Sequence, residues 1–468
     1  MACACIPIRY YIIAMVFITT YINYTTRSNM SISLPAMVQQ KGKKASIPEC
    51  KKDDPASYNK SVSDTGTKYD WNENVQGLVL GAYFYGYLIG NIPAGVMSEW
   101  IGPFKTLFAA TLLAGIFNSV CVWVTPIHWG ALFFARFIVG ATGGLVYPAL
   151  QCLIGRWAPP QERGKFVSGL MGNTLGTCLT WIVVGAVTKS YKWPFGFHIL
   201  SIQIIFYLVI FTIFTADSPE QHKWISDEEL KFIKESQEGR VSKTKAVAPY
   251  KAIFTSFPFW TLTILHFGNL WGLYVQITAV PKFMKEIIGF DIKQSGFLSS
   301  LPHLCRLFLG LGYGALGDWL KKEKFSRTLV LKSFVLLSHI VPGVLMASMG
   351  LVGCNATAAT TLLILSMSIN GAAVLTNLSN PTDLAPNFAG TIFSIISFIG
   401  GVTGFIVPSI TGVFINIYGS TTKAWALNFA LGGIIYCGCG IFFMIFGSAQ
   451  TQPWNEKKED AEPQTSAK

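Results

Sequence analysis

WGALFFARFIVGATGGLVYPALQCLIG occupies residues 129–155 and contains a single charged residue, Arg136. A helix of about 20 apolar residues crosses the roughly 30 Å hydrocarbon core of a bilayer, so this run is long enough to span a membrane. An arginine at such a depth costs free energy unless it faces a cavity or a partner. The stretch therefore predicts a membrane-spanning helix that holds one functional charge.

Similar apolar runs recur along the chain, with polar segments between them. Hydrophobic residues make up 51% of the 468 residues and charged residues only 13%, about half of the ~25% that is usual in soluble proteins. The sequence predicts an all-α membrane protein with twelve spans. These spans are 10–38, 74–97, 103–124, 129–155, 164–187, 193–216, 256–284, 292–317, 327–350, 358–380, 388–416 and 421–446. The first lacks a small-x-small cleavage site and is predicted to be retained.

A charged segment at 217–255 divides the spans six and six. We expect an N-terminal half at 1–216, a cytoplasmic central loop at 217–255 with a short amphipathic helix, and a C-terminal half at 256–446. The polar tail at 447–468 is predicted to be disordered and cytoplasmic.

Each half carries a matching motif after its second span: GVMSE at 95–99 and GALGD at 314–318. Such an echo is expected of two parallel repeats. The glycine allows two helices to approach, and the acid caps or pairs with a neighbouring helix end. We therefore assign Glu99 and Asp318 to conformational gating.

The loops also indicate an orientation. Lysine and arginine are modestly enriched in the short loops on the side of the central loop, which predicts that both termini are cytoplasmic. The glycosylation sequons at Asn59 and Asn355 fall on the opposite, exoplasmic side, which agrees with this orientation.

Buried charge is asymmetric. None of the 24 Asp and Glu residues lies in the middle third of a predicted span, whereas Arg27 and Arg306 do, and Arg136 lies eight residues into its span. A guanidinium binds carboxylate or phosphate through two parallel hydrogen bonds. Three such residues favour a positive cavity for a small anion. The alternative is that each arginine snorkels or binds helix carbonyls.

Polar and aromatic residues near these spans are candidates for the same cavity. GAYFYGY at 81–87 places Tyr83 and Tyr87 on one helical face, and HFGNLWGLY at 266–274 does the same for His266 and Asn269. Asn380 follows the tenth span. Packing remains the alternative for the aromatic residues, and a satisfied structural histidine for His303 and His339.

Several other classes of protein are disfavoured. The net charge of +12 is spread over loops, which fits membrane topology better than nucleic-acid binding. Phosphate-binding loops, His-Glu-x-x-His and paired intramembrane aspartates are missing, so an enzyme is not expected. The scattered cysteines do not indicate a metal site, and we expect no cofactor beyond Na⁺ or H⁺ as a coupling ion. Cys50 and Cys354 lie in loops predicted on the same exoplasmic side, which leaves a disulfide between them open.

Several longer motifs resemble one known family over nearly the whole chain. They are RSNMSIS at 27–33, GAYFYGY at 81–87, IPAG at 92–95, YPA at 147–149, WAPPQER at 157–163, GFLSSLP at 296–302 and DLAPNFAG at 383–390. They are similar to the major facilitator superfamily, and within it to the sodium/phosphate and organic-anion cotransporters (solute carrier family seventeen). The resemblance implies that Arg27 and Arg136 contact a substrate anion, with Tyr147 nearby, and that Arg163 belongs with the gating residues.

The sequence departs from the family pattern at several positions. Gly143 stands where proton-linked members have a glutamate, and Gln151 where a histidine follows Pro-Ala. Leu80 and Asn269 replace a histidine and an arginine of the glutamate carriers, so this chain does not look like a vesicular glutamate transporter. Arg306 is an addition to the pattern.

The expected function is secondary active transport of inorganic phosphate or organic carboxylates, coupled to Na⁺, H⁺ or membrane potential. The partners are then a small anion and the lipid bilayer, with a monomeric protein in the plasma membrane or an endolysosomal or vesicular membrane. A non-transporting anion sensor and an anion channel remain open as alternatives.

Overall fold

The computed structural model describes residues 6–38, 49–51, 66–71, 73–237, 248–290, 292–322 and 325–455. Within these ranges the chain is helical apart from connecting segments and one isolated bridge between Val38 and Tyr69. Each of the twelve predicted spans coincides with a helix or with a run of consecutive helical segments, which confirms the all-α prediction.

The first six spans are mostly continuous helices. They comprise α1 (Ile8–Met37), α2 (Glu73–Trp100), α3 (Pro103–Val124), α4 (Trp129–Trp157), the run α5 (Arg163–Ser168), η3 (Gly169–Met171) and α6 (Gly172–Ser190), and α7 (Trp193–Phe214).

The last six spans are more often interrupted. The seventh span is the run α10 (Phe257–Tyr274), η5 (Val275–Ala279), α11 (Val280–Phe283) and η6 (Met284–Ile288), and the eighth is α12 (Ile292–Lys322). The ninth is the run α13 (Arg327–Val335), η7 (Leu336–Ile340), α14 (Val341–Ser348) and η8 (Met349–Leu351), and the tenth is α15 (Ala356–Ile369) with η9 (Asn370–Val374), followed by the short helix α16 (Asn380–Leu384). The eleventh is η10 (Pro386–Phe388), α17 (Ala389–Gly401) and α18 (Thr403–Tyr418), and the twelfth is α19 (Thr422–Phe446). The segments η5, η6 and η7 are π-helical, a form that often marks functional sites.

The helical runs differ in hydropathy. Eight runs among the described residues are long and apolar enough to cross a membrane by length and composition alone. The runs that begin with α1, α2, α10 and α12 are not among those eight. These four bring polar or charged side chains into the interior, for example Arg27 on α1, His266 on α10 and Arg306 on α12. These polar side chains make the four runs less apolar than the other eight, and a charged side chain inside a membrane needs a cavity or a partner.

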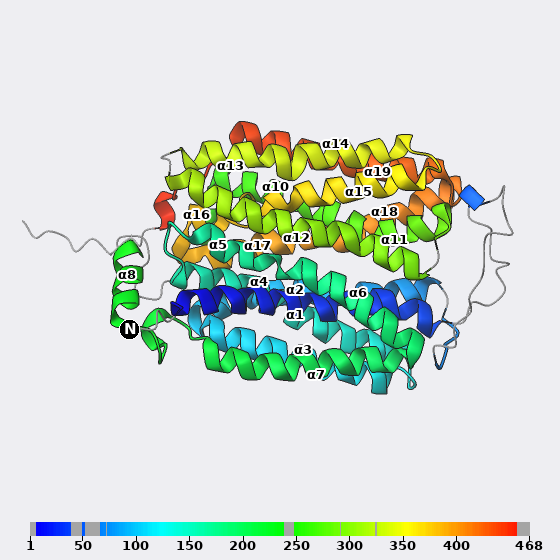
Figure 1. Cartoon of the computed structure of the whole chain (residues 1–468), viewed down its shortest axis with the longest axis horizontal. Helices are drawn as coiled ribbons and strands as arrows, with labels where there is room; N and C mark the ends of the chain where they lie inside the picture. The colour runs from blue at the N-terminus through cyan, green and yellow to red at the C-terminus, as the bar shows by residue number, and fades with distance from the viewer. Residues whose placement is uncertain are drawn as a thin grey trace, which may run out of the picture.

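The helices form two packed groups (Figure 1). Helices α1 to α7 lie together, with α2 against α4 and α1 against α6, and α10 to α19 form the second group. The groups meet mainly where α2 contacts α17 and where α6 contacts α12. The first described residues, α8 (Asp227–Gln237) and the last described segment, η11 (Pro453–Asn455), lie at one end, which we call the terminal end.

The helix expected in the central loop is present as α8 and is tied to the first group. The carboxylate of Glu229 accepts hydrogen bonds from the backbone N–H groups of Ile8 and Arg9, at 2.8 and 3.0 Å. It therefore caps the N-terminus of α1. A short helix α9 (Tyr250–Thr255) then leads into α10.

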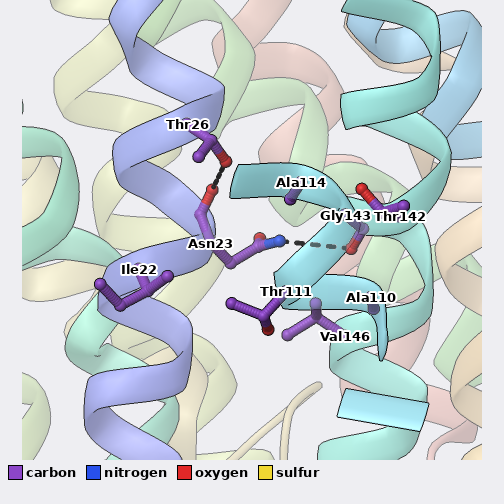
Figure 2. A pocket seen from close by; sticks show the side chains of 9 residues that line it. All are labelled: Ile22, Asn23, Thr26, Ala110, Thr111, Ala114, Thr142, Gly143 and Val146. Carbon is purple, nitrogen blue, oxygen red and sulfur yellow. Dashed lines mark hydrogen bonds between the residues drawn. The ribbon is translucent and has the colours of Figure 1, made fainter. Parts of the chain in front are cut away.

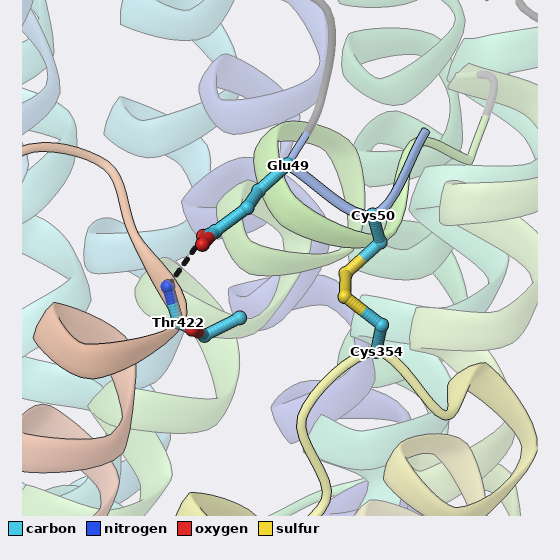
Figure 3. Close-up of a disulfide and its surroundings, with 4 residues drawn as sticks. All are labelled: Glu49, Cys50, Cys354 and Thr422. Carbon is cyan, nitrogen blue, oxygen red and sulfur yellow. Dashed lines mark hydrogen bonds between the residues drawn. A yellow bond between two sulfur atoms is a disulfide. The ribbon is translucent and has the colours of Figure 1, made fainter. Parts of the chain in front are cut away.

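The opposite end carries a covalent link between the groups, and we call it the disulfide end. Cys50 and Cys354, 304 residues apart, form a disulfide (Figure 3). The adjacent Glu49 accepts a 2.6 Å hydrogen bond from the backbone N–H of Thr422, at the start of α19. The segment η1 (Glu49–Lys51), which lies between α1 and α2 in the chain, is thus bound to the second group. The disulfide left open by the sequence is present.

The two predicted sequons differ in what is described of them. Asn59 lies outside the described residues. Asn355 is exposed at this end and accepts a hydrogen bond from the N–H of Ala358 as the N-cap of α15.

Candidate functional site

Arg27 lies between the two groups of helices, enclosed by aromatic rings. Its guanidinium carbon lies 4.9–5.4 Å from the centroids of five rings. These are Tyr24 of α1, Tyr83, Phe84 and Tyr87 of α2, and Tyr274 of α10. We call them the aromatic cage. Ring faces attract a cation, so the cage lowers the cost of burying the charge.

The hydrogen bonds of Arg27 go to neutral partners. The guanidinium donates to the hydroxyl of Tyr24 at 3.3 Å and to that of Tyr274, which belongs to the other group. Among the described residues no carboxylate pairs with it, and its side chain is buried. The charge is therefore screened by dipoles and rings rather than neutralised, which leaves it able to attract an anion.

Sequence reasoning found Tyr83 and Tyr87 but left Tyr24 and Phe84 out of the site. Tyr24 precedes Arg27 by three residues, the spacing at which two helical side chains are neighbours. That spacing was the available signal for Tyr24. Tyr274 comes from the other helix group, and only the tertiary structure brings its ring to Arg27 of α1 and Phe84 of α2.

Arg136 has different hydrogen-bond partners from Arg27. It is buried on α4, and its Nη1 donates a 2.9 Å hydrogen bond to the backbone carbonyl of Thr26, with Nη2 3.5 Å from that of Arg27. Its guanidinium carbon also lies 5.4 Å from the Tyr83 ring. In this conformation Arg136 holds the α1 backbone beside Arg27, which is the helix-carbonyl alternative raised by the sequence.

A small hollow lies next to these residues, between α1, α3 and α4 (Figure 2). Asn23 points into it and lies 3.5 Å from the carbonyl of Gly143. A side chain at Gly143 would clash with the Tyr83 hydroxyl. The space that a glutamate would need is therefore taken by Tyr83. The hollow has room for about one water molecule.

Arg306 lies on α12 at a second hollow. It is buried, and its Nε and Nη1 have no hydrogen-bond partner in the described part of the chain. The residues around this hollow come from both helix groups: Tyr24, Asn173, Thr174, Thr177, Leu273, Ile277 and His303. This hollow is smaller than a water molecule in this conformation.

The remaining predicted site residues lie in other surroundings. His266 hydrogen-bonds Asn377 at 2.9 Å, and Asn269 accepts from Asn370 at 3.1 Å, so both belong to a polar network inside the second group. Tyr147 is buried and stacks on Phe393, with its hydroxyl unpartnered among the described residues.

Asn380 begins α16, the short helix that also carries Asp383. His339 bonds Ser338 and the carbonyl of Leu265, as a structural histidine would. Because α16 lies at the terminal end, Asn380 belongs with the residues described next.

At the terminal end, Glu99 crosses from one helix group to the other. Its carboxylate accepts from the N–H of Thr391 at 3.1 Å and from the hydroxyl of the same residue at 2.8 Å. Thr391 lies in the first turn of α17. Gly95 makes this approach possible, because a Cβ there would lie 2.5 Å from the Cα of Thr391. Glu99 therefore caps α17.

Asp318 makes the reciprocal contact. Its two carboxylate oxygens accept from the N–H groups of Gly164 and Lys165, both at 3.0 Å, at the start of α5. A side chain at Gly314 would overlap the Ser168 hydroxyl. Both acids thus contact a neighbouring helix end, as the motif predicted, and both contacts join the two groups.

Arg163 adds a third contact at this end. Its Nη1 donates to the carbonyl of Thr382 at 2.9 Å and lies 3.6 Å from the carboxylate of Asp383. Arg327 contacts the same carboxylate at 3.2 Å. All three contacts join the two helix groups at the terminal end.

A surface ion pair lies beside these contacts. Glu162 pairs with Arg9 at 2.9 Å and with Lys165 at 3.3 Å. Burial alone would raise the pKa of Glu162, but the hydrogen bonds and charges of Arg9 and Lys165 lower that pKa below its usual value. The carboxylate is therefore ionised at neutral pH and links the start of α1 to the start of α5.

Comparison with known proteins identifies the fold. Residues 16–408 match the family model described as Major Facilitator Superfamily. Among solved structures, the proton:xylose symporter XylE aligns with a TM-score of 0.68 at 14% identity, over 95% of this chain and 97% of XylE. The E. coli fucose:proton symporter FucP aligns with a TM-score of 0.60 at 13% identity, over 94% of this chain and 99% of FucP. At these identities the likeness shows the fold alone.

Curated relatives narrow the family. Human sialin is 30% identical over 96% of this chain and 91% of its own length. A Drosophila melanogaster protein named as an inorganic phosphate cotransporter is 28% identical over 97% and 88%. Human vesicular glutamate transporter 2 is 26% identical over 98% and 78%. The chain is therefore a multi-pass membrane transporter that belongs to the major facilitator superfamily and, within it, to the sodium/phosphate and organic-anion cotransporters of solute carrier family seventeen.

Proposed function

We propose that the protein is a symporter that carries small anions, inorganic phosphate or organic carboxylates, by alternating access. The observation that carries this proposal is Arg27, a buried cation between the two helix groups whose partners are neutral rings and hydroxyls. An anion entering from either side would be attracted to it. The names of the relatives, which include an inorganic phosphate cotransporter and glutamate transporters, agree with an anionic substrate.

In this proposal the rocking units are the N-terminal half at 1–216 and the C-terminal half at 256–446, with 217–255 as the connecting loop and 447–468 as a tail. Glu99, Asp318 and Arg163 would hold the terminal end closed through contacts that can break and reform. Arg136 would position α1, and Tyr83, Tyr87 and Tyr147 would line the path of the anion.

We further propose that the terminal end faces the cytoplasm and the disulfide end faces the exoplasm or a vesicle lumen. Disulfides persist in oxidising compartments, which supports this orientation, as does the exposed sequon at Asn355 next to Cys354. The protein would act as a monomer in the plasma membrane or in an endolysosomal or vesicular membrane.

Uptake into proteoliposomes tests the transport proposal. Labelled phosphate, glutamate, urate and sialic acid are offered under an imposed Na⁺ gradient, pH gradient or membrane potential. Arg27→Ala is expected to abolish uptake, with unchanged yield of folded protein. Lys231→Ala, on the exposed side of α8, serves as a control and should transport normally.

Three results would contradict the proposal. Normal uptake by Arg27→Ala would remove Arg27 from the site. Flux that neither saturates nor follows a cation gradient would indicate a channel. Binding without flux in folded wild-type protein would indicate a sensor.

A further inference from the structure

Arg306 is a buried cation with two guanidinium nitrogens, Nε and Nη1, that have no hydrogen-bond partner among the described residues. Its exposed fraction is 2%. Its Nε and Nη1 have no partner in the described ranges, whereas Arg27 donates to two hydroxyls and Arg136 to carbonyls. Leaving buried donors of a charged group without acceptors is costly. Retaining Arg306 is understandable if a ligand supplies the missing acceptors in another conformation.

The surroundings of Arg306 suit a ligand. Asn173 and Thr177 of α6 line the same hollow, and the Asn173 Oδ1 is buried without a partner among the described residues. His303, one turn before Arg306 on α12, lies there too. Because α6 and α12 belong to different helix groups, any rocking of the groups widens or narrows this hollow.

Arg306 and Arg27 share one neighbour, Tyr24. The Tyr24 hydroxyl accepts a hydrogen bond from Arg27, and the Tyr24 side chain also lines the Arg306 hollow. Two cations thus flank a single tyrosine between the halves.

We propose that Arg306 is a second anion contact and that the transported substrate is an organic carboxylate extending past Tyr24 between Arg306 and Arg27. This inference rests on the proposed transport function and names the substrate class within it. The walls of the Arg306 hollow support it. Leu273 and Ile277 provide apolar surface that packs against a carbon skeleton, while Asn173 and Thr177 offer neutral hydrogen-bonding groups. Inorganic phosphate would use neither the apolar wall nor two separated cations.

The test measures binding and transport with purified full-length protein. Inorganic phosphate, glutamate, sialic acid and urate are used as probes, with affinity taken from thermal stabilisation and from counterflow in proteoliposomes. Wild type should bind an organic carboxylate more tightly than phosphate. Arg306→Ala should weaken that affinity about 10- to 100-fold. Arg306→Lys should recover only part of it, because an ammonium lacks the planar fork. Cys305→Ala, the neighbouring position on α12 but outside the hollow, should bind as wild type does.

A second variant covers the case in which Arg306→Ala does not fold. Asn173→Asp places a carboxylate in the Arg306 hollow, where it competes with the substrate. This variant should be at least as thermostable as wild type and should lose organic-anion affinity about tenfold or more.

The outcomes are separable. Wild type that binds phosphate and no organic anion overturns the substrate class, although the transport proposal stands. Organic-anion affinity within twofold of wild type in both Arg306→Lys and Asn173→Asp overturns the role of Arg306. Wild type that neither binds nor transports any of the four anions overturns this inference together with the proposed function.

Discussion

The two ends of the bundle are joined across the halves by different chemistry. At the terminal end, Glu99 and Asp318 cap helices of the opposite group through hydrogen bonds of 2.8–3.1 Å. At the disulfide end, Cys50 and Cys354 form a covalent bond. A capping interaction contributes about 0.5–2 kcal/mol, so it can break during a transport cycle, whereas a disulfide does not.

The covalent link does not start from a membrane-spanning helix of the first group. Cys50 belongs to η1, so the disulfide ties η1 to the second group. Under the proposed function, the weaker contacts at the terminal end are the ones that would break on opening, and four predictions test this comparison.

The largest effect is expected from Gly95→Val. The added side chain would strike the backbone of Thr391 and force α2 away from α17 at the terminal end. We expect uptake to fall by more than about 100-fold. Gly77→Val, near the other end of the same helix, provides a matched control, because a Cβ there meets nothing within 4 Å. Equal uptake by the two variants would show that the close approach at Gly95 has no part in transport.

A smaller loss is expected from Asp318→Ala, which removes the cap of α5. Loss of about 1–2 kcal/mol shifts the equilibrium between conformations about 5- to 30-fold. Cysteine accessibility at Ser168, measured in a Ser168→Cys background, should rise by a similar factor as this end opens. Asp318→Asn keeps one acceptor and should lie between Asp318→Ala and the parent. An unchanged labelling rate in Asp318→Ala would mean that the cap does not hold this end closed.

The disulfide variant Cys50→Ser/Cys354→Ser is expected to affect stability more than transport. Removing a disulfide costs about 2–5 kcal/mol, which corresponds to a Tm lower by roughly 4–10 °C. Uptake should stay within about twofold of wild type at a temperature well below Tm, because the disulfide joins η1, and not a membrane-spanning helix of the first group, to the second group. A tenfold loss of uptake in folded protein would reverse the comparison between the two ends.

The smallest effect is expected from Glu49→Gln. The neutral side chain still accepts from Thr422 but loses the favourable interaction with the α19 dipole, about 0.3–1 kcal/mol. Tm should fall by about 0.6–2 °C and uptake should not change. A fall in Tm equal to that of the disulfide variant would show that Glu49, rather than the disulfide, anchors η1.

Much of the fold could be predicted because it depends on local properties. Arg136 in an otherwise apolar run predicts a span with a buried charge, and the structure has that span at Trp129–Trp157. The site could be predicted only in part. Arg27 is central, as expected, but His266 is engaged with Asn377, and Asn380 begins the helix that carries Asp383. A polar residue within a span indicates that the side chain has a partner, but the amino-acid sequence does not show which residue that partner is.

The sequence by itself determined the twelve spans, the two Gly-x-x-x-acid motifs and the presence of three arginines within spans whose middle thirds hold no Asp or Glu. These follow from hydropathy and spacing, which act within one segment. Only the tertiary structure decided that Glu99 caps α17, that Asp318 caps α5 and that Cys50 pairs with Cys354. It also decided that Arg136 bonds the α1 backbone, whereas Nε and Nη1 of Arg306 have no partner among the described residues. The physical reason is that each of these contacts joins different segments, in most cases more than 100 residues apart, and the packing of the helices sets which groups meet.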